Sequence, residues 1–321
     1  MQSSSRVLAA ALLAVSTSAR AGMVCDTLAT TAHYAALASK KITTALMYDP
    51  FNACHNNVEF HAGLCCTNAQ LAATPIFDSG APFASGLTAL AVTKTAVGIG
   101  PNPPGATCSQ PYIEGDLATG GGVVVSAYGL TPGQTGVIDT TGTHPALGAC
   151  TQALADALAA STAFAAMTPT QVFDKVIIQP GQVLDLVVSD GEVVQMKQLN
   201  LVRGPYSHPD QGTCPGLQSK LRISGLGPGE KAVINVTATV SIGDCSVIEN
   251  SEFAGVVINA SGPGSVRFGI SVDNQGAAIL APLRTIGVKG PGNPAPSRVN
   301  NLWGKSVQMS GNVDVFPAIC P

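Results

Sequence analysis

The stretch PALGACTQALADALAASTAFAAM, Pro145 to Met167, decides the fold. Its alanines favour a helix, its first residue suits the start of one, and Pro169 ends the run. Larger apolar side chains recur at helical spacing along one narrow stripe, at Leu147, Cys150, Leu154 and Leu158. Because a single amphipathic helix cannot bury its stripe alone, we expect the surrounding segments to form a large apolar surface.

Those surrounding segments have the pattern of short β-strands separated by glycine-containing corners. In Asn235 to Ile242, apolar and polar residues alternate with a period of two, and Ser265 to Val272 repeats the pattern. Short strands, glycine corners and one flanking helix predict a mainly β fold, a β-solenoid with the helix along one side. A β-sandwich is the competing fold.

The chain divides into segments of different composition. Residues 1–21 have a positive residue, an apolar core and an Ala-Arg-Ala ending, which predicts a secretory signal peptide. Residues 22–80 are rich in Ala, Thr and Cys, and we interpret them as a small Cys-rich helical region, with one or two helices in Thr27 to Met47. The solenoid is expected over residues 87–316, with the helix at 145–167, and residues 317–321 form a C-terminal tail.

Composition excludes some classes of function. Charged residues make up 11% of the 321, and the net charge is -3, which argues against nucleic acid as a partner. We expect no transmembrane segment after the signal peptide, no cofactor and no metal. The protein is therefore predicted to be secreted, extracellular or associated with a cell wall, and its oligomeric state is left open.

The nine cysteines all follow the predicted cleavage site, and in an oxidising compartment most should be paired. They are Cys25, Cys54, Cys65, Cys66, Cys108, Cys150, Cys214, Cys245 and Cys320. Several lie close to His55 and His61, which would suit a zinc site, but the absence of a C-x-x-C pair favours disulfides. Two Asn-X-Ser/Thr sequons, at Asn235 and Asn259, are glycosylation candidates.

Five segments, in order, resemble the choice-of-anchor A family of secreted adhesive domains. They are Tyr112–Leu130 (YIEGDLATGGGVVVSAYGL), Gln152–Met167, Gly227–Val236 (GPGEKAVINV), Ala277–Arg284 (AAILAPLR) and Trp303–Phe316 (WGKSVQMSGNVDVF). The resemblance covers roughly Leu87 to Phe316 and implies a β-solenoid-like adhesive domain without catalytic residues. The layout also resembles, more distantly, secreted ice-binding β-solenoid proteins. The Cys-rich N-terminal region departs from both groups.

Three functions follow as hypotheses. The first is a non-enzymatic adhesion or matrix-binding protein whose partner is an extracellular polysaccharide or another cell-surface component. Its contact surface would be a broad strand face, with Thr237, Thr239 and Ser241 as the possible outward binding residues. The second is ice binding, which needs an array of threonines repeated from strand to strand; no other strand repeats this pair, which counts against it.

The third hypothesis is a polysaccharide-active enzyme, which needs clustered carboxylates. The candidate groups are Asp185, Asp190 and Glu192; Asp244, Glu249 and Glu252; and Asp273 near Arg267. Each group is equally explained by ordinary loop residues. No catalytic motif accompanies them, so we expect no enzyme.

Overall fold

The structure is a computed structural model of the full chain. It describes residues 24–29, 31, 34–45, 47–48, 54–55, 58–60, 63–71, 112–113, 117–119, 138–139, 145–204, 214, 217–250, 255–291 and 296–316. The predicted signal peptide, Cys108, Glu252, Cys320 and the side chains of Cys54, Cys65, Cys66 and Cys150 lie outside what can be described.

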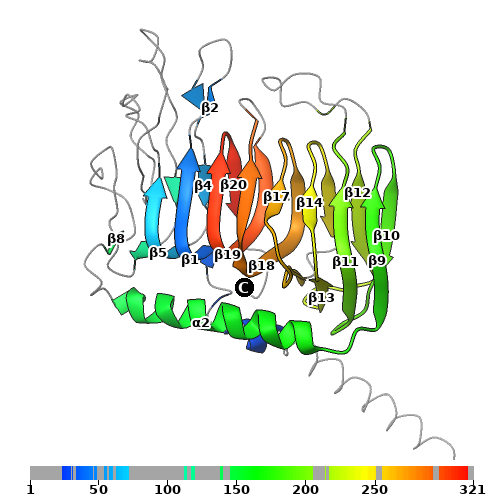
Figure 1. The fold of residues 1–321 in the computed structure, drawn as a ribbon, viewed down its shortest axis with the longest axis horizontal. Helices are drawn as coiled ribbons and strands as arrows, with labels where there is room; N and C mark the ends of the chain where they lie inside the picture. The colour runs from blue at the N-terminus through cyan, green and yellow to red at the C-terminus, as the bar shows by residue number, and fades with distance from the viewer. Residues whose placement is uncertain are drawn as a thin grey trace, which may run out of the picture.

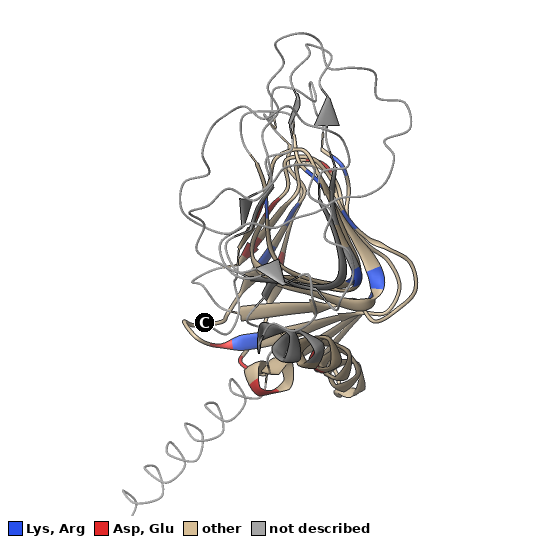
Figure 2. Cartoon of the chain, turned by 90° about the vertical axis from the view of Figure 1, so that its left-hand side faces the viewer, with Lys and Arg blue, Asp and Glu red and all other residues tan. Residues whose placement is uncertain are grey.

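The strands form a stack of coils with a triangular cross-section, which confirms the predicted β-solenoid (Figures 1 and 2). Eighteen strands belong to one continuous sheet, and every pairing within it is parallel. Each complete coil crosses three faces in turn. We call them face a, which contacts the helix, face b and face c.

Face a contains β13 (Lys231–Val236), β16 (Gly255–Asn259), β7 (Leu117–Thr119), β8 (Ile138–Asp139) and the first parts of β9 (Gln171–Ile178), β11 (Val193–Leu201), β1 (Tyr34–Ala45) and β5 (Gly63–Leu71). Face b contains β14 (Val240–Ile242), β17 (Val266–Phe268) and the second parts of β9, β11, β1 and β5. Face c contains β10 (Val183–Val187), β12 (Lys220–Ser224), β15 (Val247–Asn250), β20 (Val313–Phe316), β4 (Val58–Phe60) and β6 (Tyr112–Ile113). The long strands β18 (Asp273–Lys289) and β19 (Ser297–Ser310) each pass from face c through face a to face b.

The order of the coils in space differs from their order in the chain. β1 pairs with β19 on one side and β5 on the other, and β4 pairs with β20, so the N-terminal strands stack on the C-terminal coil. Helix α2 (Pro145–Ala166) runs back along face a and contacts strands from β7 to β13 (Figure 1). Twenty-two residues span about 33 Å, and the six strand spacings from β7 to β13 span about 29 Å, so one helix of this length covers the face.

The helix position confirms the prediction, but the buried stripe differs from the predicted one. The side chains that face the sheet are small, apart from one aromatic: Ala153, Ala157, Ala160, Ser161 and Phe164 are buried. Leu158, placed on the predicted stripe, is 46% exposed, and Leu154 is only partly buried. The sheet supplies the large partners instead, with Leu37, Val233, Val257, Leu280 and Trp303 in the same apolar cluster. Alanines let the helix approach closely, and the bulk comes from the strands.

The predicted N-terminal helical region is wrong for most of its length. A short helical stretch covers residues 24–28, but Thr27 to Met47 consists mainly of β1, and Cys-rich β5 is also a strand. Ala36, Leu37 and Ala38 are all buried, because one face of β1 points into the solenoid and the other contacts the helix layer. A strand buried on both faces loses its period of two, and its alanines then suggest a helix. These strands continue the solenoid, so the expected start of the solenoid at residue 87 is also wrong.

The segment Asn235 to Ile242 was predicted as one strand and is two. β13 ends at Val236 on face a, β14 begins at Val240 on face b, and residues 237–239 form the corner between them. Similarly, only Val266–Phe268 of Ser265 to Val272 is a strand, and Ile270 lies in a turn. The period of two survives each bend, which is why the sequence pattern does not reveal the corner.

Candidate functional site

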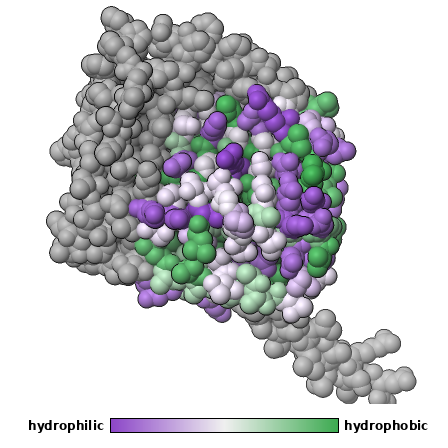
Figure 3. All heavy atoms as spheres, in the orientation of Figure 1, coloured by the Kyte–Doolittle hydropathy of each residue, from purple (hydrophilic) through white to green (hydrophobic). Residues whose placement is uncertain are grey.

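Face b is the candidate site. Helix α2 covers face a instead, and among the described residues the outward side chains of face b contact one another less than those of face c do. Figures 1 and 3 are viewed onto face b. Its inward side chains, such as Leu199, Val240, Val266, Ile286 and Val307, are fully buried in the main core cluster. The alternate side chains therefore point outward from parallel strands that lie about 4.8 Å apart.

Two outward rows cross the described part of face b. The first row follows the register from Lys175 and Gln198 through Thr239, Ser265 and Thr285 to Ser306. Four neighbouring coils thus place a hydroxyl at the same level, beginning at the corner residue Thr239. Thr239 is exposed and Ser265 and Thr285 are partly exposed, whereas Ser306, the last of the four, is only 6% exposed. The second row is less uniform and contains Ile177, Asn200, Ser241, Arg267, Gly287 and Gln308.

The hydroxyl row was missed from the sequence, apart from Thr239. Its members Thr239, Ser265, Thr285 and Ser306 are separated by 26, 20 and 21 residues, because the corner loops differ in length. A search for Ser or Thr at intervals of one coil, with a tolerance of several residues, would have found them. The predicted outward set is divided instead: Thr237 and Thr239 lie at the a/b corner and Ser241 lies on face b.

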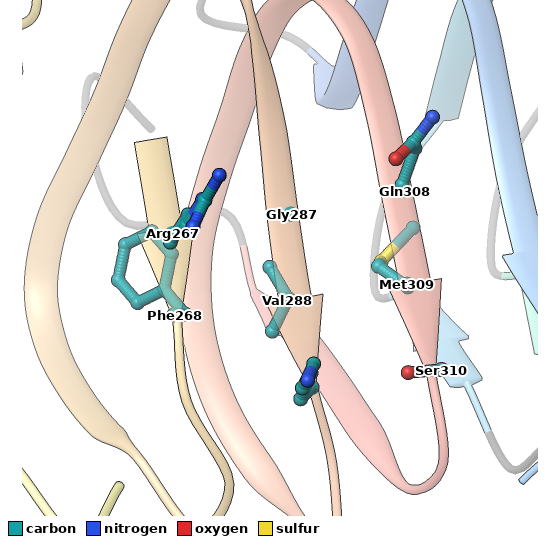
Figure 4. Close-up of a pocket in the computed structure, with 8 residues that line it drawn as sticks. Arg267, Phe268, Gly287, Val288, Gln308, Met309 and Ser310 are labelled. Carbon is teal, nitrogen blue, oxygen red and sulfur yellow. The ribbon is translucent and has the colours of Figure 1, made fainter. Parts of the chain in front are cut away.

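A shallow groove of about 330 Å³ crosses face b at Gly287 (Figure 4). Gly287 lies between Arg267 and Gln308 in the second row, and its missing side chain leaves the gap. Lys289 and Ser310 also line the groove, and so do the core residues Phe268, Val288 and Met309. Arg267 donates through Nε to the hydroxyl of Ser265 at 3.0 Å, so the two rows are linked at this coil.

Face c is different, because its charged side chains bind one another. Arg222 lies between Asp185, at 3.1 Å, and Glu249, at 2.9 Å, and Lys220 also contacts Glu249 at 3.4 Å. The hydrogen bond from Arg222 lowers the pKa of Glu249, and the same bond raises the pKa of Arg222. Figure 2 shows acidic and basic residues together on one uncovered side of the triangle and mainly basic residues on the other.

Two of the candidate catalytic carboxylates, Asp185 and Glu249, come together on Arg222, but they belong to different predicted groups, and the others have separate partners. Asp185 and Glu249 belong to the face c ladder, and Asp190 accepts a hydrogen bond from the backbone N–H of Lys231 at the c/a corner. Asp244 pairs with Arg203 at 2.8 Å at the b/c corner. Asp273 lies on face c, whereas Arg267 lies on face b.

Glu192 likewise has a structural role. Burial would raise its pKa, but hydrogen bonds from Thr170, Gln171 and Ser189 outweigh burial and lower it. In the part of the chain that the structure describes, no group of three His, Cys, Asp or Glu side chains could hold a metal ion.

Both predicted glycosylation residues lie beneath helix α2, which corrects that prediction. Asn235 is 3% exposed and Asn259 is fully buried, and each donates through its amide to a helix carbonyl, of Phe164 and Ser161 respectively. A glycan on either amide would fill the space that the helix occupies.

Two of the nine candidate cysteines form a described disulfide, whose pairing the sequence left open. Cys214 and Cys245 form a disulfide that closes a 31-residue separation and ties the segment after β11 to the b/c corner. Cys25 is also disulfide-bonded. Among the described helices, none is long and apolar enough to cross a membrane.

Comparison with known proteins finds similarity only among solved structures. No family model and no curated protein sequence matches the chain. An ice-binding protein of the Antarctic ascomycete Antarctomyces psychrotrophicus aligns with a TM-score of 0.45 and 12% identity over 91% of this chain and 98% of its own. An ice-binding protein of an Arctic yeast aligns with a TM-score of 0.43 and 10% identity over 91% of this chain and 94% of its own. A domain of a Shewanella frigidimarina ice-binding protein aligns with a TM-score of 0.35 and 13% identity over 90% of this chain and 94% of its own.

These findings correct the predicted adhesion function. The resemblance to the choice-of-anchor A family has no match among family models, and the solved structures reported above are ice-binding proteins rather than adhesins. In addition, the single broad face through Thr237, Thr239 and Ser241 that the prediction used is interrupted by a corner.

Proposed function

We propose that the protein binds ice through face b. The observation that carries the proposal is the row of exposed or partly exposed hydroxyls at Thr239, Ser265 and Thr285, one from each of three neighbouring coils, which the buried Ser306 continues in the next coil. A protein that binds ice in liquid water must distinguish ordered from disordered water molecules. A straight row of like groups on a fixed lattice of about 4.8 Å can align many waters at once, which a single pocket cannot do.

The other two faces suit this role less well. Face a is covered by α2 along the strands that the helix contacts. Face c presents paired charges around Arg222, and charged groups hold their own hydration shells. Face b also presents the exposed cations Lys175, Arg267 and Lys289. The one in the middle of the described rows, Arg267, is a guanidinium, which is more weakly hydrated than an ammonium group.

A fixed scaffold supports the same proposal. An ice-binding row must keep its spacing without a ligand, since immobilising side chains on binding costs about 0.5–1.5 kcal/mol each. Alternate residues of every face b strand are locked in the core, from Val176 in β9 to Val307 in β19. Stacking of coils also keeps the sheet flatter than a free sheet would be.

We also propose that the protein is exported. The pattern of residues 1–21 and the disulfide between Cys214 and Cys245 both fit an oxidising compartment. The partner is then ice outside the cell.

The test uses a matched pair of tyrosine substitutions. Thr285→Tyr places a bulky side chain in the hydroxyl row, whereas Ser224→Tyr places the same bulk on face c, where Ser224 is likewise half-buried at the end of β12. We expect the unsubstituted protein to shape ice crystals and to show thermal hysteresis, Thr285→Tyr to lose most of it, and Ser224→Tyr to retain it.

Two results would contradict the proposal. Absence of both ice shaping and thermal hysteresis in the folded, disulfide-bonded protein would refute ice binding. Equal loss in the two tyrosine variants, with unchanged circular dichroism, would refute the assignment to face b.

A further inference from the structure

The end of the solenoid at β9 and β10 presents unpaired strand edges. In the described part of the chain, β9 pairs only with β11 and β10 pairs only with β12. Figure 1 shows both strands at the right-hand edge of the molecule, with the helix ending below them. Their outer N–H and C=O groups therefore form a template for another strand.

The apolar interior is also partly uncovered at this end. A hollow of about 480 Å³ is lined by residues that include Phe173, Ile178 and Leu184. Phe173 and Leu184 are only partly buried, whereas Met196 and Leu221, their neighbours in the next coil, are fully buried. The first coil thus lacks the layer that every internal coil has on both sides.

Outward side chains of the same coil are unusually apolar. Val172, Ile177, Val183 and Val187 are 66%, 46%, 48% and 62% exposed, and they account for four of the seven large hydrophobic side chains that are exposed in the described chain. Apolar residues gather along this edge in Figure 3.

We propose that a second copy of the chain stacks end-on against this coil, with the face b part of β9 antiparallel to the partner's β10. A two-fold axis across the end of the solenoid reverses strand direction, so the contact is antiparallel, and it occurs twice. Outward residues must meet outward residues, which restricts the register to steps of two.

One register satisfies shape and charge together. When Ile177 lies opposite Val183 of the second copy, Lys175 lies opposite its Asp185, because the two strands run in opposite directions. Two apolar pairs and two ion pairs then form by symmetry. Val172, on face a, meets its own copy near the same axis. This complementarity between β9 and β10 is the reason to assign the end to a second copy rather than to an unrelated partner.

The proposal does not depend on ice binding, because the contact uses the end of the solenoid and leaves the row from Thr239 to Ser306 free. Charged edge residues usually prevent strand addition. Here the charges have opposite signs on the two edges that meet, so they select this antiparallel partner.

Sedimentation velocity over a range of concentrations, combined with charge reversal, tests the proposal. The unsubstituted protein should dimerise, and Lys175→Glu or Asp185→Lys alone should weaken the dimer about tenfold or more, because each creates two like-charge contacts. Asp185→Lys also breaks the ion pair of Asp185 with Arg222 of its own chain, so Lys175→Glu is the cleaner single variant. The double variant should restore dimerisation. Leu283→Asp, which changes an equally exposed apolar residue at the a/b corner between the two halves of β18, should leave dimerisation unchanged.

Three outcomes would overturn the proposal of an end-on dimer. A monomer at every concentration overturns the proposal, as do single reversals that leave the dimer intact or a double variant that stays as weak as the singles. Circular dichroism and the melting temperature of each variant show whether a loss of dimer reflects a loss of fold.

Discussion

Asn259 donates a hydrogen bond through Nδ2 to the side-chain oxygen of Asn235, 2.8 Å away in the neighbouring coil, beneath helix α2. The same Nδ2 donates to the carbonyl of Ser161 at 3.0 Å, and the Ser161 hydroxyl donates back to Oδ1 of Asn259 at 2.6 Å. Asn235 donates in turn to the carbonyl of Phe164 at 2.6 Å. The two asparagines thus anchor the last turns of an alanine-rich helix to two adjacent strands.

This network predicts a large loss of stability in Asn259→Ala. The substitution leaves the Ser161 hydroxyl and the Asn235 oxygen buried without their partner, and each such group costs about 1–3 kcal/mol. We expect the free energy of unfolding to fall by about 2–4 kcal/mol, measured by denaturant titration. Asn200→Ala, on open face b, is the control and should change it by less than about 0.5 kcal/mol. Similar values for both variants would show that the network contributes little.

The same asparagines show why part of the fold was predictable and part was not. The sequence predicted solenoid and helix correctly, because the helix has its own propensity and the period of two in β14 and β17 comes from burial of one face. A sequon, in contrast, is a three-residue motif that contains no information on tertiary position. Only the placement of α2 over Asn235 and Asn259 reveals that both are inaccessible.

The site was predicted less well, for a related reason. Strand neighbours in a solenoid are one coil apart, so Thr285 and Ser306 become neighbours only when the lengths of the intervening corners are known. β1 is a harder case, since its partner β19 is more than 250 residues away and the alanines of β1 favour a helix locally. Long-range pairing decides its structure, and no local pattern reports it.

The buried side chain of Arg284 provides the second prediction. Its Nε donates to the carbonyl of Gly262 and one terminal nitrogen donates to that of Ala238 at 2.6 Å, so it joins the a/b corners of three successive coils. Burial lowers the pKa of Arg284, which shows the cost of keeping the charge there. Hydrogen bonds to charged groups contribute about 1.5–3 kcal/mol each and oppose that cost, while the other terminal nitrogen of Arg284 is buried without a hydrogen-bond partner.

We therefore expect Arg284→Ala to lower the free energy of unfolding by about 2–4 kcal/mol. Arg267→Ala removes the same side chain from the exposed surface of face b and serves as the control, with an expected change below about 0.5 kcal/mol. Stabilisation by Arg284→Ala would mean that the desolvation cost dominates.

A pH-dependent prediction follows from the face c ladder. Arg222 lowers the pKa of Glu249 in the folded protein. A carboxylate whose pKa is depressed by folding stabilises the fold at neutral pH, and this contribution is lost as the pH falls below about 4.3 through the folded pKa. Because the pair is partly exposed, screening by solvent keeps its contribution to stability small.

The measurement compares Arg222→Ala with the unsubstituted protein by chemical unfolding at a series of pH values. The unsubstituted protein should be slightly more stable at neutral pH, and the two curves should converge in acid. Lys197→Ala is the control, since Lys197 and Asp174 are both more than half exposed and their contact is long, at 3.3 Å. A difference that persists unchanged in strong acid would assign the effect of Arg222 to packing instead.

Gly287 offers the last prediction, because it can be tested for stability and for function at once. A Cβ added there would meet no atom nearer than the carbonyl oxygen of Val266, at 4.0 Å, and Gly287 is in a strand. Gly287→Thr should therefore stabilise the protein by about 0.5–1 kcal/mol, since threonine favours strands and glycine costs backbone entropy. The new hydroxyl also fills the groove between Arg267 and Gln308, next to the row of Thr285. If face b binds ice, thermal hysteresis should rise.

Gly243→Thr is the control, because a Cβ there would lie 2.5 Å from the backbone nitrogen of Arg203 and should destabilise the fold. A stabilised Gly287→Thr variant with reduced hysteresis would indicate that the open groove itself, rather than the hydroxyl lattice, contacts the ice.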